Sequence, residues 1–297
     1  MDTKRTFPLL FIVAVAIFGF SCGYQKKTAA AKRELSIVDS QLQGHDKNLQ
    51  ALEAKRKIKL EENTIDDTAG IRLQRLINKT QSEITQMLNE NTILIGNAEV
   101  NKADWERLSK NLSTSRLASK KINDRMLILN DLINGNTVIN LDQDVLFEPG
   151  KYTVSKQVAN AIGKFFEPAT KEIDLFTKKY PDFPMALVIT AKGYADATSI
   201  AEGSALYNDL KDKLSLSGKP LTTENLNKEL SDARAKSVIE LFTTFTKGRA
   251  SDGGNVKNVA YLYEGKGEAL PDPKVKDYKV NDPRRRVVML FWCVFPE

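Results

Sequence analysis

Residues 26–135 form a stretch of the chain without proline, rich in Lys, Glu, Gln, Leu and Ala. Proline is the residue that most strongly interrupts a helix, and these other residue types favour one. Apolar residues recur here at alternating steps of three and four, as along the buried seam of a coiled coil or bundle. The positions that share this spacing are Leu35, Val38, Leu42, Leu49, Leu52; Leu73, Ile77, Thr80, Ile84, Met87, Asn91, Leu94; and Trp105, Leu108, Leu112, Ser115, Ser119, Ile122, Met126, Leu129, Ile133. We therefore expect a helical coiled-coil or bundle stalk over residues 26–135.

Two breaks divide this stalk, near residues 62–70 and 96–104, where Asn, Asp, Thr and Gly supply turn and capping groups. Asp104, followed by Trp105 and Glu106, has the pattern of a helix start. Three helices of about 30 residues would fold back into a bundle about 45 Å long, whereas an oligomeric coiled coil would extend to about 160 Å. The spacing favours neither form. It suits a plain spacer as well as a surface for homo-oligomers or envelope-complex partners.

Composition excludes several classes of protein. The 297 residues are 41% hydrophobic with a net charge of +6, which is ordinary for a globular chain. Bases and acids are interleaved, without zinc-ligand spacing, a basic stripe or an aromatic stacking motif, so we expect no nucleic-acid binding. The lone histidine, His45, occupies a seam position without ligand companions, which favours a register-setting role. We expect no metal and no cofactor.

The N-terminus has the pattern of a secretory signal peptide. Lys4 and Arg5 precede an apolar run at residues 7–20, which ends in Ser-Cys-Gly at 21–23. At about 14 residues, the run covers only about 21 Å of a hydrocarbon core about 30 Å thick, which favours a cleaved signal. The ending resembles a bacterial lipoprotein processing site, which implies that Cys22 becomes a lipidated first residue held by several acyl chains. The alternative is an uncleaved anchor over residues 7–24.

The second half of the chain alternates strand and helix patterns. Short β-branched or apolar runs predict strands, and longer runs with an apolar face predict helices. In chain order these are a strand at 137–141, a loop at 142–150, a helix at 154–179 that kinks or restarts at Pro168, a strand at 186–190, a helix at 226–246 capped by Thr222 or Thr223, and strands at 258–263 and 287–295. This order predicts an α+β domain at 137–297, a two-layer sandwich with helices on one side of its sheet.

A set of four phrases runs through this second half in a fixed order. They are Asp-Val-Leu-Phe at 144–147, Gly-Tyr-Ala-Asp at 193–196, Leu-Ser-Asp-Ala-Arg-Ala-Lys-Ser-Val at 230–238, and Gly-Lys-Gly-Glu-Ala-Leu-Pro at 265–271, running on to Arg-Arg-Arg-Val at 284–287. Together they resemble the peptidoglycan-binding domain of the OmpA family, which also occurs in Pal and MotB. The resemblance covers residues 137–295 and implies a βαβαββ sandwich.

Two charged residues in these phrases are complementary to the zwitterionic end of an amino acid. Asp196 follows a central strand, at an edge where sites on α/β sheets gather, and Arg234 lies in the first turns of a helix. A guanidinium holds a carboxylate with two parallel hydrogen bonds, and a carboxylate accepts hydrogen bonds from an ammonium group. The family resemblance implies that Asp196 and Arg234 bind diaminopimelate of peptidoglycan stem peptides. It implies that Arg285, Arg286, Leu230 and Ser231 complete this site, with Ser231 satisfying a free backbone group.

The chain departs from the family pattern between these two residues. Ala195 stands where Thr is common, and the residues after Asp196 lack the usual glycine. Residues 199–222 form an insertion, in which Ala205, Leu206, Leu210 and Leu214 have near-helical spacing. This insertion either folds over the pocket or bulges away from it.

These features predict a non-covalent tether with membrane lipid at one end and peptidoglycan at the other. Residues 1–22 are then a signal peptide and anchor, and the protein faces the periplasm, with an outer-membrane lipoprotein favoured and the inner membrane as the other location. The alternative is a peptidoglycan-anchored subunit of a secretion or motor complex, held by an uncleaved transmembrane helix. A motor stator needs an ionisable residue in the membrane, which residues 7–20 lack. Without histidine or cysteine constellations, only Asp142, Asp144 and Glu148 are candidates for enzymatic wall cleavage, and we expect no catalysis.

Overall fold

The computed structural model describes residues 7–161, 163–246 and 256–296; for residues 7–22, 156, 157 and 160 it describes the backbone only. The described residues fall into two compact units. The bundle unit comprises residues 7–54 and 74–133, and the sheet unit comprises Lys55–Leu73 and residues 134–296. The chain is therefore a mixed α and β protein with a helical N-terminal region, as the sequence predicts. Lys55–Leu73 lies in the middle of the stalk expected at 26–135, so this part of it belongs to the sheet unit and not to the bundle unit.

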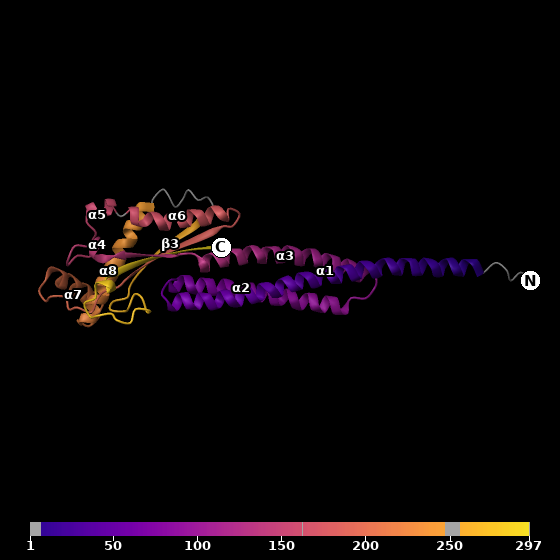
Figure 1. The fold of residues 1–297 in the computed structure, drawn as a ribbon, viewed down its shortest axis with the longest axis horizontal. Helices are drawn as coiled ribbons and strands as arrows, with labels where there is room; N and C mark the ends of the chain where they lie inside the picture. Colours follow the sequence, from indigo (N-terminus) through magenta and orange to yellow (C-terminus); the bar gives the residue numbers. More distant parts are fainter. Residues whose placement is uncertain (1–6, 162, 247–255, 297) are drawn as a thin grey trace, which may run out of the picture. The chain divides into compact units, whose positions relative to one another are not determined.

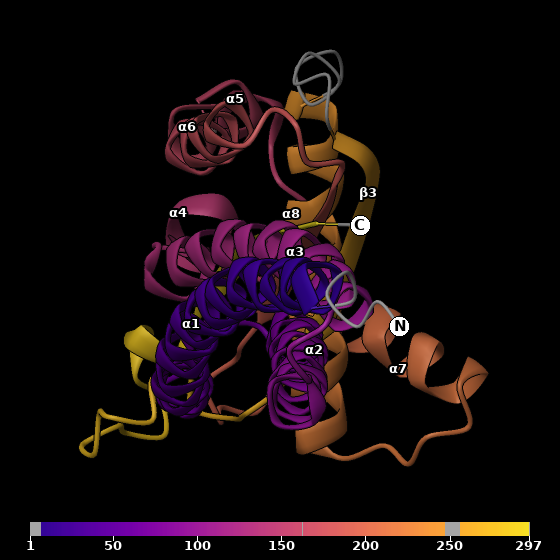
Figure 2. The same cartoon turned by 90° about the vertical axis from the view of Figure 1, so that its right-hand side faces the viewer.

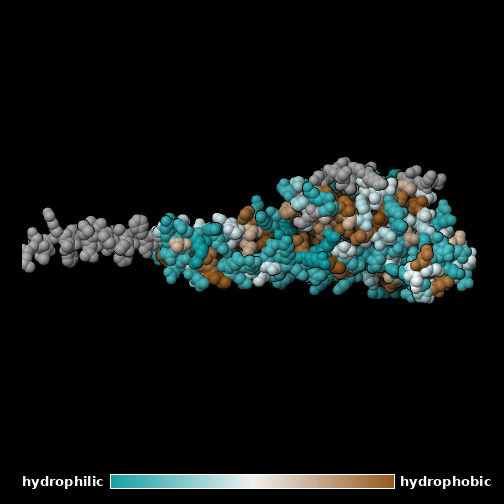
Figure 3. Space-filling model, turned by 180° about the vertical axis from the view of Figure 1, so that it is seen from behind, coloured by the Kyte–Doolittle hydropathy of each residue, from teal (hydrophilic) through white to brown (hydrophobic). Residues whose placement is uncertain are grey.

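In the bundle unit, parts of helices α1 (Phe7–Glu61), α2 (Asp67–Asn97) and α3 (Lys102–Asn134) lie side by side (Figures 1 and 2). The breaks between these helices fall where the sequence places them. Most of the seam positions are buried, among them Leu35, Leu42, Ile84, Leu108 and Ile122. On the face drawn in Figure 3, hydrophobic residues are scattered among hydrophilic ones. Of the two forms that the spacing allows, the structure has the bundle folded back within one chain.

Polar residues in the seams hold these helices in register. The amide of buried Asn91 donates to Asp39 Oδ1 at 2.6 Å, and its oxygen accepts from the Ser115 hydroxyl at 3.1 Å. Arg125 of α3 pairs with Glu83 of α2 at 2.7 Å. His45 is half-buried, and burial lowers its pKa. A polar residue at a seam position favours one alignment of the helices over its neighbours.

Helix α3 begins two residues before the predicted start at Asp104. The side chain of Asn101 accepts a hydrogen bond from the backbone N–H of Asp104 at 2.7 Å, as an N-cap residue does. The Asp104 carboxylate in turn accepts from the backbone N–H of Glu99 at 2.8 Å and from Asn101 Nδ2 at 3.1 Å. The predicted helix start is therefore present but lies two residues earlier, with Asn101 in the N-cap position and Asp104 closing the reciprocal contact from inside the helix.

In the sheet unit, the described residues form a four-stranded sheet in the order β1-β4-β2-β3. Its strands are β1 (Val138–Asp142), β2 (Met185–Gly193), β3 (Val256–Gly265) and β4 (Val287–Pro296). Strand β2 pairs in parallel with β3 and antiparallel with β4, and β4 also pairs antiparallel with β1. The predicted strands are present, and the structure extends β2 and β3 by several residues.

The helices of the sheet unit follow in the predicted chain order, with additions. The short helix α4 (Gln143–Leu146) lies in the segment expected as a loop, because Asp142 caps it by accepting from the backbone N–H of Asp144 at 2.9 Å. Between β1 and β2 come α5 (Lys156–Ala161) and α6 (Gly163–Lys179); between β2 and β3 come α7 (Ala205–Leu216) and α8 (Thr223–Thr246); and the 3-10 helix η1 (Pro283–Arg285) precedes β4. Helix α7 occupies the insertion, where the spacing predicts a helix.

Helix α6 does not restart at Pro168, one of the two possibilities that the sequence predicts for the 154–179 helix. Pro168 lies inside α6, which is described from Gly163 to Lys179. A Cβ on Gly163 would lie 2.9 Å from the Phe245 ring, so the described start of α6 packs closely on α8. Pro168 is exposed in the second turn, where the proline removes one helical hydrogen bond beside solvent.

Helices α6 and α8 pack on the sheet, and a hairpin made of the end of α1 and the start of α2 (Lys55–Leu73) packs on it as well. Thr190 and Lys192 of β2 and Tyr194 just after it meet this hairpin, while the alternate residue Gly193 meets α8. Successive residues of a strand point to opposite faces, so the hairpin covers the face that α8 leaves open. The prediction that helices cover only one side was therefore wrong.

Buried charges hold the hairpin on the sheet. Lys192 Nζ lies 3.2 Å from Asp66 and 2.8 Å from Asp67, and the Lys192 and Asp66 side chains are only 2% and 4% exposed. Asp66 also caps α2, accepting from the backbone N–H of Thr68 at 3.0 Å. Asn63, at a left-handed φ of 54°, forms the turn and donates to the Tyr194 hydroxyl at 2.6 Å. Asparagine tolerates that backbone conformation better than most residues.

We predict that Lys192→Met destabilises the sheet unit by about 3–5 kcal/mol, because it leaves the Asp66 carboxylate buried without its cation. The measurement is urea unfolding followed by Trp292 fluorescence in a Trp105→Phe background. The matched control is Lys274→Met, which removes an exposed pair with Glu62 and should cost about 0–1 kcal/mol. Adding Asp66→Asn, which keeps the cap and removes the charge, should recover part of the loss. Equal effects of Lys192→Met and Lys274→Met would contradict this role.

Candidate functional site

The ends of β2 and β3 pack against the backbone of α8 without room for side chains. A Cβ on Gly193 would lie 2.1 Å from the Ser231 carbonyl oxygen, and one on Gly265 would lie 2.4 Å from the Asp232 nitrogen. Ser231 is fully buried; its hydroxyl donates to the Lys228 carbonyl at 2.8 Å and accepts from the Gly267 N–H at 2.9 Å. The expectation that Ser231 satisfies a free backbone group is confirmed. This close approach sets the distance between the strand ends and α8.

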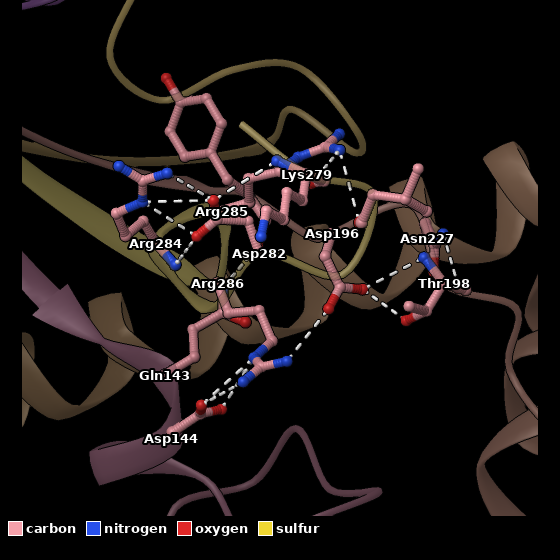
Figure 4. Close-up of polar contacts among 12 residues, drawn as sticks. Gln143, Asp144, Asp196, Thr198, Asn227, Lys279, Asp282, Arg284, Arg285 and Arg286 are labelled. Carbon is pink, nitrogen blue, oxygen red and sulfur yellow. Dashed lines mark hydrogen bonds and ion pairs between the residues drawn. The ribbon is translucent and has the colours of Figure 1, made fainter. Parts of the chain in front are cut away.

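Asp196 lies just beyond the end of β2, with both carboxylate oxygens in use (Figure 4). Oδ1 accepts from the Thr198 hydroxyl at 2.5 Å and from its backbone N–H at 3.2 Å. Oδ2 lies 3.1 Å from Arg286 Nη1. Arg286 also binds Asp144, at 2.6 Å from its Nη2, and this contact raises the pKa of the Arg286 guanidinium. Arg286 is thus shared between two carboxylates.

Arg234 reaches from α8 to the loop after α4. Its Nε and Nη2 donate to the Lys151 carbonyl at 3.3 and 3.2 Å, its Nη1 donates to Gln143 Oε1, and its guanidinium lies 5.3 Å from the centre of the Phe147 ring. Burial lowers the pKa of Arg234 to about 10, opposed by the nearby Asp144 charge. The group therefore remains a cation at neutral pH. The hydrogen bonds of Arg234 to the described residues are all with neutral oxygens, so no carboxylate of the described part of the chain binds that charge directly.

A pocket of about 760 Å³ lies where these elements meet. Of the predicted site residues, Asp196, Arg234, Arg286 and Leu230 line it. Other charged lining residues are Asp144, Glu148 and Lys151. The structure therefore brings the two principal predicted residues, which are 38 positions apart in the chain, to one cavity. The guanidiniums of Arg234 and Arg286 supply donors for a carboxylate, and the Asp196 carboxylate supplies acceptors for an ammonium group.

The three consecutive arginines before β4 have three different environments (Figure 4). Arg284 pairs with Asp282 at 2.6 Å and is half exposed. Arg285 is buried and donates to backbone carbonyls of Glu268, Lys279 and Val280. Arg286 alone of the three lines the pocket. Arg285, predicted as a site residue, thus braces the loop that precedes β4, and Ser231 likewise contacts backbone and not the pocket.

Gln143 is the main residue of this site that the sequence does not reveal. Its Nε2 donates to the Tyr194 carbonyl at 2.6 Å and to the Val287 carbonyl at 3.0 Å, while its Oε1 accepts from Arg234. It is almost fully buried. One side chain thus joins the ends of three strands to α8. A glutamine after a strand carries no pattern that distinguishes it, and only its position before the Asp144 phrase hints at a role.

Asn227 was missed in the same way. It is buried on α8, and its amide donates to the Thr198 carbonyl at 3.1 Å and to Glu268 Oε1 at 2.8 Å. These contacts fix the loop that carries Asp196.

The carboxylates considered for catalysis have separate positions: Asp142 caps α4, Asp144 pairs with Arg286, and Glu148 lines the pocket.

Cys22, the predicted lipidation site, lies in the α1 backbone, and its side chain is outside the described part of the structure. Among described residues, no helix has an apolar stretch long enough to cross a membrane.

A scan against models of protein families matches none, and a search of curated proteins returns no relative.

We predict that Gly193→Ala destabilises the protein by about 1–3 kcal/mol, because its Cβ forces α8 away from β2. Gly44→Ala is the control, since a Cβ on that helical glycine would meet open space. The control should stabilise its helix by about 0.5–1 kcal/mol. Thermal unfolding by circular dichroism checks both, and an unchanged melting temperature for Gly193→Ala would refute the close approach.

Proposed function

We propose that this protein is a non-covalent tether that binds the zwitterionic end of diaminopimelate in peptidoglycan through its sheet unit. The sheet unit is, in this proposal, a peptidoglycan-binding domain of the OmpA type with a βαβαββ sandwich. The observation that carries the proposal is the convergence of Asp196, Arg234 and Arg286 on one pocket. The four phrases of the sequence supply its second support.

The charges of the pocket suit a ligand with one carboxylate and one ammonium group. Among the residues that the structure describes, Arg234 donates only to neutral oxygens of Gln143 and Lys151, so a ligand carboxylate would meet a cation that no described carboxylate binds directly. Asp196 would accept from the ligand ammonium. Since Arg286 has Asp144 as a second partner, it can release Asp196 without losing all of its ion pairs. Ligand binding then exchanges one ion pair for another.

The expected affinity of a single site is modest. A hydrogen bond to a charged group contributes about 1.5–3 kcal/mol, so three or four of them support weak to micromolar binding. Loss of the Arg286–Asp196 ion pair when the ligand binds lowers the affinity further. Peptidoglycan repeats its stem peptides, and many anchored copies facing one polymer bind with higher avidity than one copy. A reversible tether therefore needs no covalent step.

We predict that Asp196→Asn and Arg234→Gln each weaken binding of a soluble stem-peptide fragment by about 10- to 150-fold, since each removes one charge-assisted contact. Asparagine retains an acceptor for Thr198, and glutamine retains part of the packing on Phe147. Titration of the fragment and sedimentation with purified peptidoglycan both measure the effect.

Asp212→Asn and Lys236→Gln are matched controls, because they remove the same charges from exposed positions that do not line the pocket. They should bind like the unchanged protein. Full retention of the Asp196→Asn/Arg234→Gln double variant on peptidoglycan would overturn the proposed site.

The membrane end of the tether is, in the same proposal, a lipidated Cys22. Multiple acyl chains bind membranes firmly, at about 0.8 kcal/mol per buried methylene. Metabolic labelling with a palmitate analogue should mark the protein and should fail with Cys22→Ala. Cys293→Ala is the control, because that thiol is buried in β4 and burial raises its pKa. An unlabelled protein, or label that survives Cys22→Ala, would contradict lipidation.

A further inference from the structure

Residues 199–222 form one wall of the pocket. Helix α7 lies beside α8, on the opposite side of it from α5 and α6 (Figures 1 and 2). The segment before α7 and its first turn line the cavity with Ile200, Ala201, Ser204, Ala205 and Leu206. Of the two arrangements left open by the sequence, the insertion therefore borders the pocket and does not bulge away from it.

This wall is fastened in place by an apolar contact and a polar one. Leu210 and Leu214 of α7 are buried against Leu226 and Leu230 of α8, with Ile200 and Leu206 packed beside them. Tyr152, which follows the pocket residue Lys151, is bound to the same helix. The Tyr152 hydroxyl donates to Asp209 at 2.6 Å, and Lys213 lies 3.1 Å from Asp209 and 4.0 Å from the centre of the Tyr152 ring.

The two walls of the pocket differ in chemistry. The residues Asp144, Asp196, Arg234 and Arg286 bear charge, whereas the lining residues from the insertion are uncharged and mostly aliphatic. A zwitterionic group held by the charged residues leaves the rest of its ligand facing Ile200 and Leu206. An apolar lining makes binding more favourable only for ligands that bury apolar surface against it.

From this division we propose that the insertion is a specificity wall. It selects ligands that carry their zwitterionic end on an aliphatic chain of several methylenes, and it discriminates against short amino acids with the same charged groups. The proposal rests on the proposed function, since the charged end must bind first. Each methylene buried against the wall corresponds to about fourfold in affinity.

Binding of free meso-diaminopimelate and of alanine, titrated by NMR, tests the proposal on the full chain. The unchanged protein should bind meso-diaminopimelate at least tenfold more tightly than alanine. The double variant Ile200→Ser/Leu206→Ser should weaken meso-diaminopimelate by about three- to tenfold and alanine by less than twofold, because only the longer ligand reaches the wall. Leu216→Ser is the control, since that leucine is 90% exposed on the same helix.

A second variant distinguishes an effect on ligand binding from a loss of folding. Ala205 is exposed at the pocket wall, so Ala205→Trp fills the cavity without disturbing the core and should abolish binding of meso-diaminopimelate. Equal affinity for both amino acids, or meso-diaminopimelate binding unaffected by both wall variants, would overturn the specificity wall while the proposed function stands. Binding of neither amino acid, with peptidoglycan retention insensitive to Asp196→Asn, would overturn the proposed function itself.

Discussion

The contact on which the candidate site depends is the close approach of β2 and β3 to helix α8. Gly193 and Gly265 let the backbones meet, and the Ser231 hydroxyl bonds the Gly267 N–H that follows. Asp196 comes three residues after Gly193, and Arg234 comes three residues after Ser231. The backbone positions from which the acidic and basic side chains extend are therefore set by this packing. Preorganisation of this kind lowers the entropic cost of binding a small charged ligand.

Local patterns in the sequence identify the elements and the main charged residues, because both depend on neighbours in the chain. Heptad spacing marks the bundle seams, and strand periodicity marks β2 and β4. Asp196 and Arg234 stand out through the phrases around them. The convergence of Asp196, Arg234 and Arg286 on one pocket is consistent with that prediction. Local pattern does not reveal which partner each residue binds. The three adjacent arginines look equivalent in the sequence, yet Arg284 binds the Asp282 carboxylate, Arg285 binds backbone carbonyls and Arg286 binds the pocket carboxylates.

Lys192 shows that the fold, too, depends on partners that local sequence pattern does not reveal. A lysine inside a strand predicts a solvent-facing side, since lysine is rarely buried without a partner. Here the partners come from Asp66 and Asp67, more than a hundred residues earlier in the chain. No periodicity connects the two segments, so the second covered face of the sheet was not predictable. A buried ion pair contributes little net stability, but packing arrangements that leave either charge buried without its partner are much less stable. The pair therefore favours one docking of the hairpin.

Strand β2 connects the site both to the hairpin, through Lys192, and to helix α8, through Gly193. On one face its Lys192 meets the hairpin, and at its end the Tyr194 hydroxyl accepts from Asn63 while burial raises the pKa of that phenol. The Tyr194 carbonyl accepts from Gln143, whose other amide atom holds Arg234. Hairpin, strand and pocket are thus linked by a series of buried and partly buried hydrogen bonds. Because such bonds are costly to break one at a time, the position of Arg234 depends on the docked hairpin as well as on helix α8.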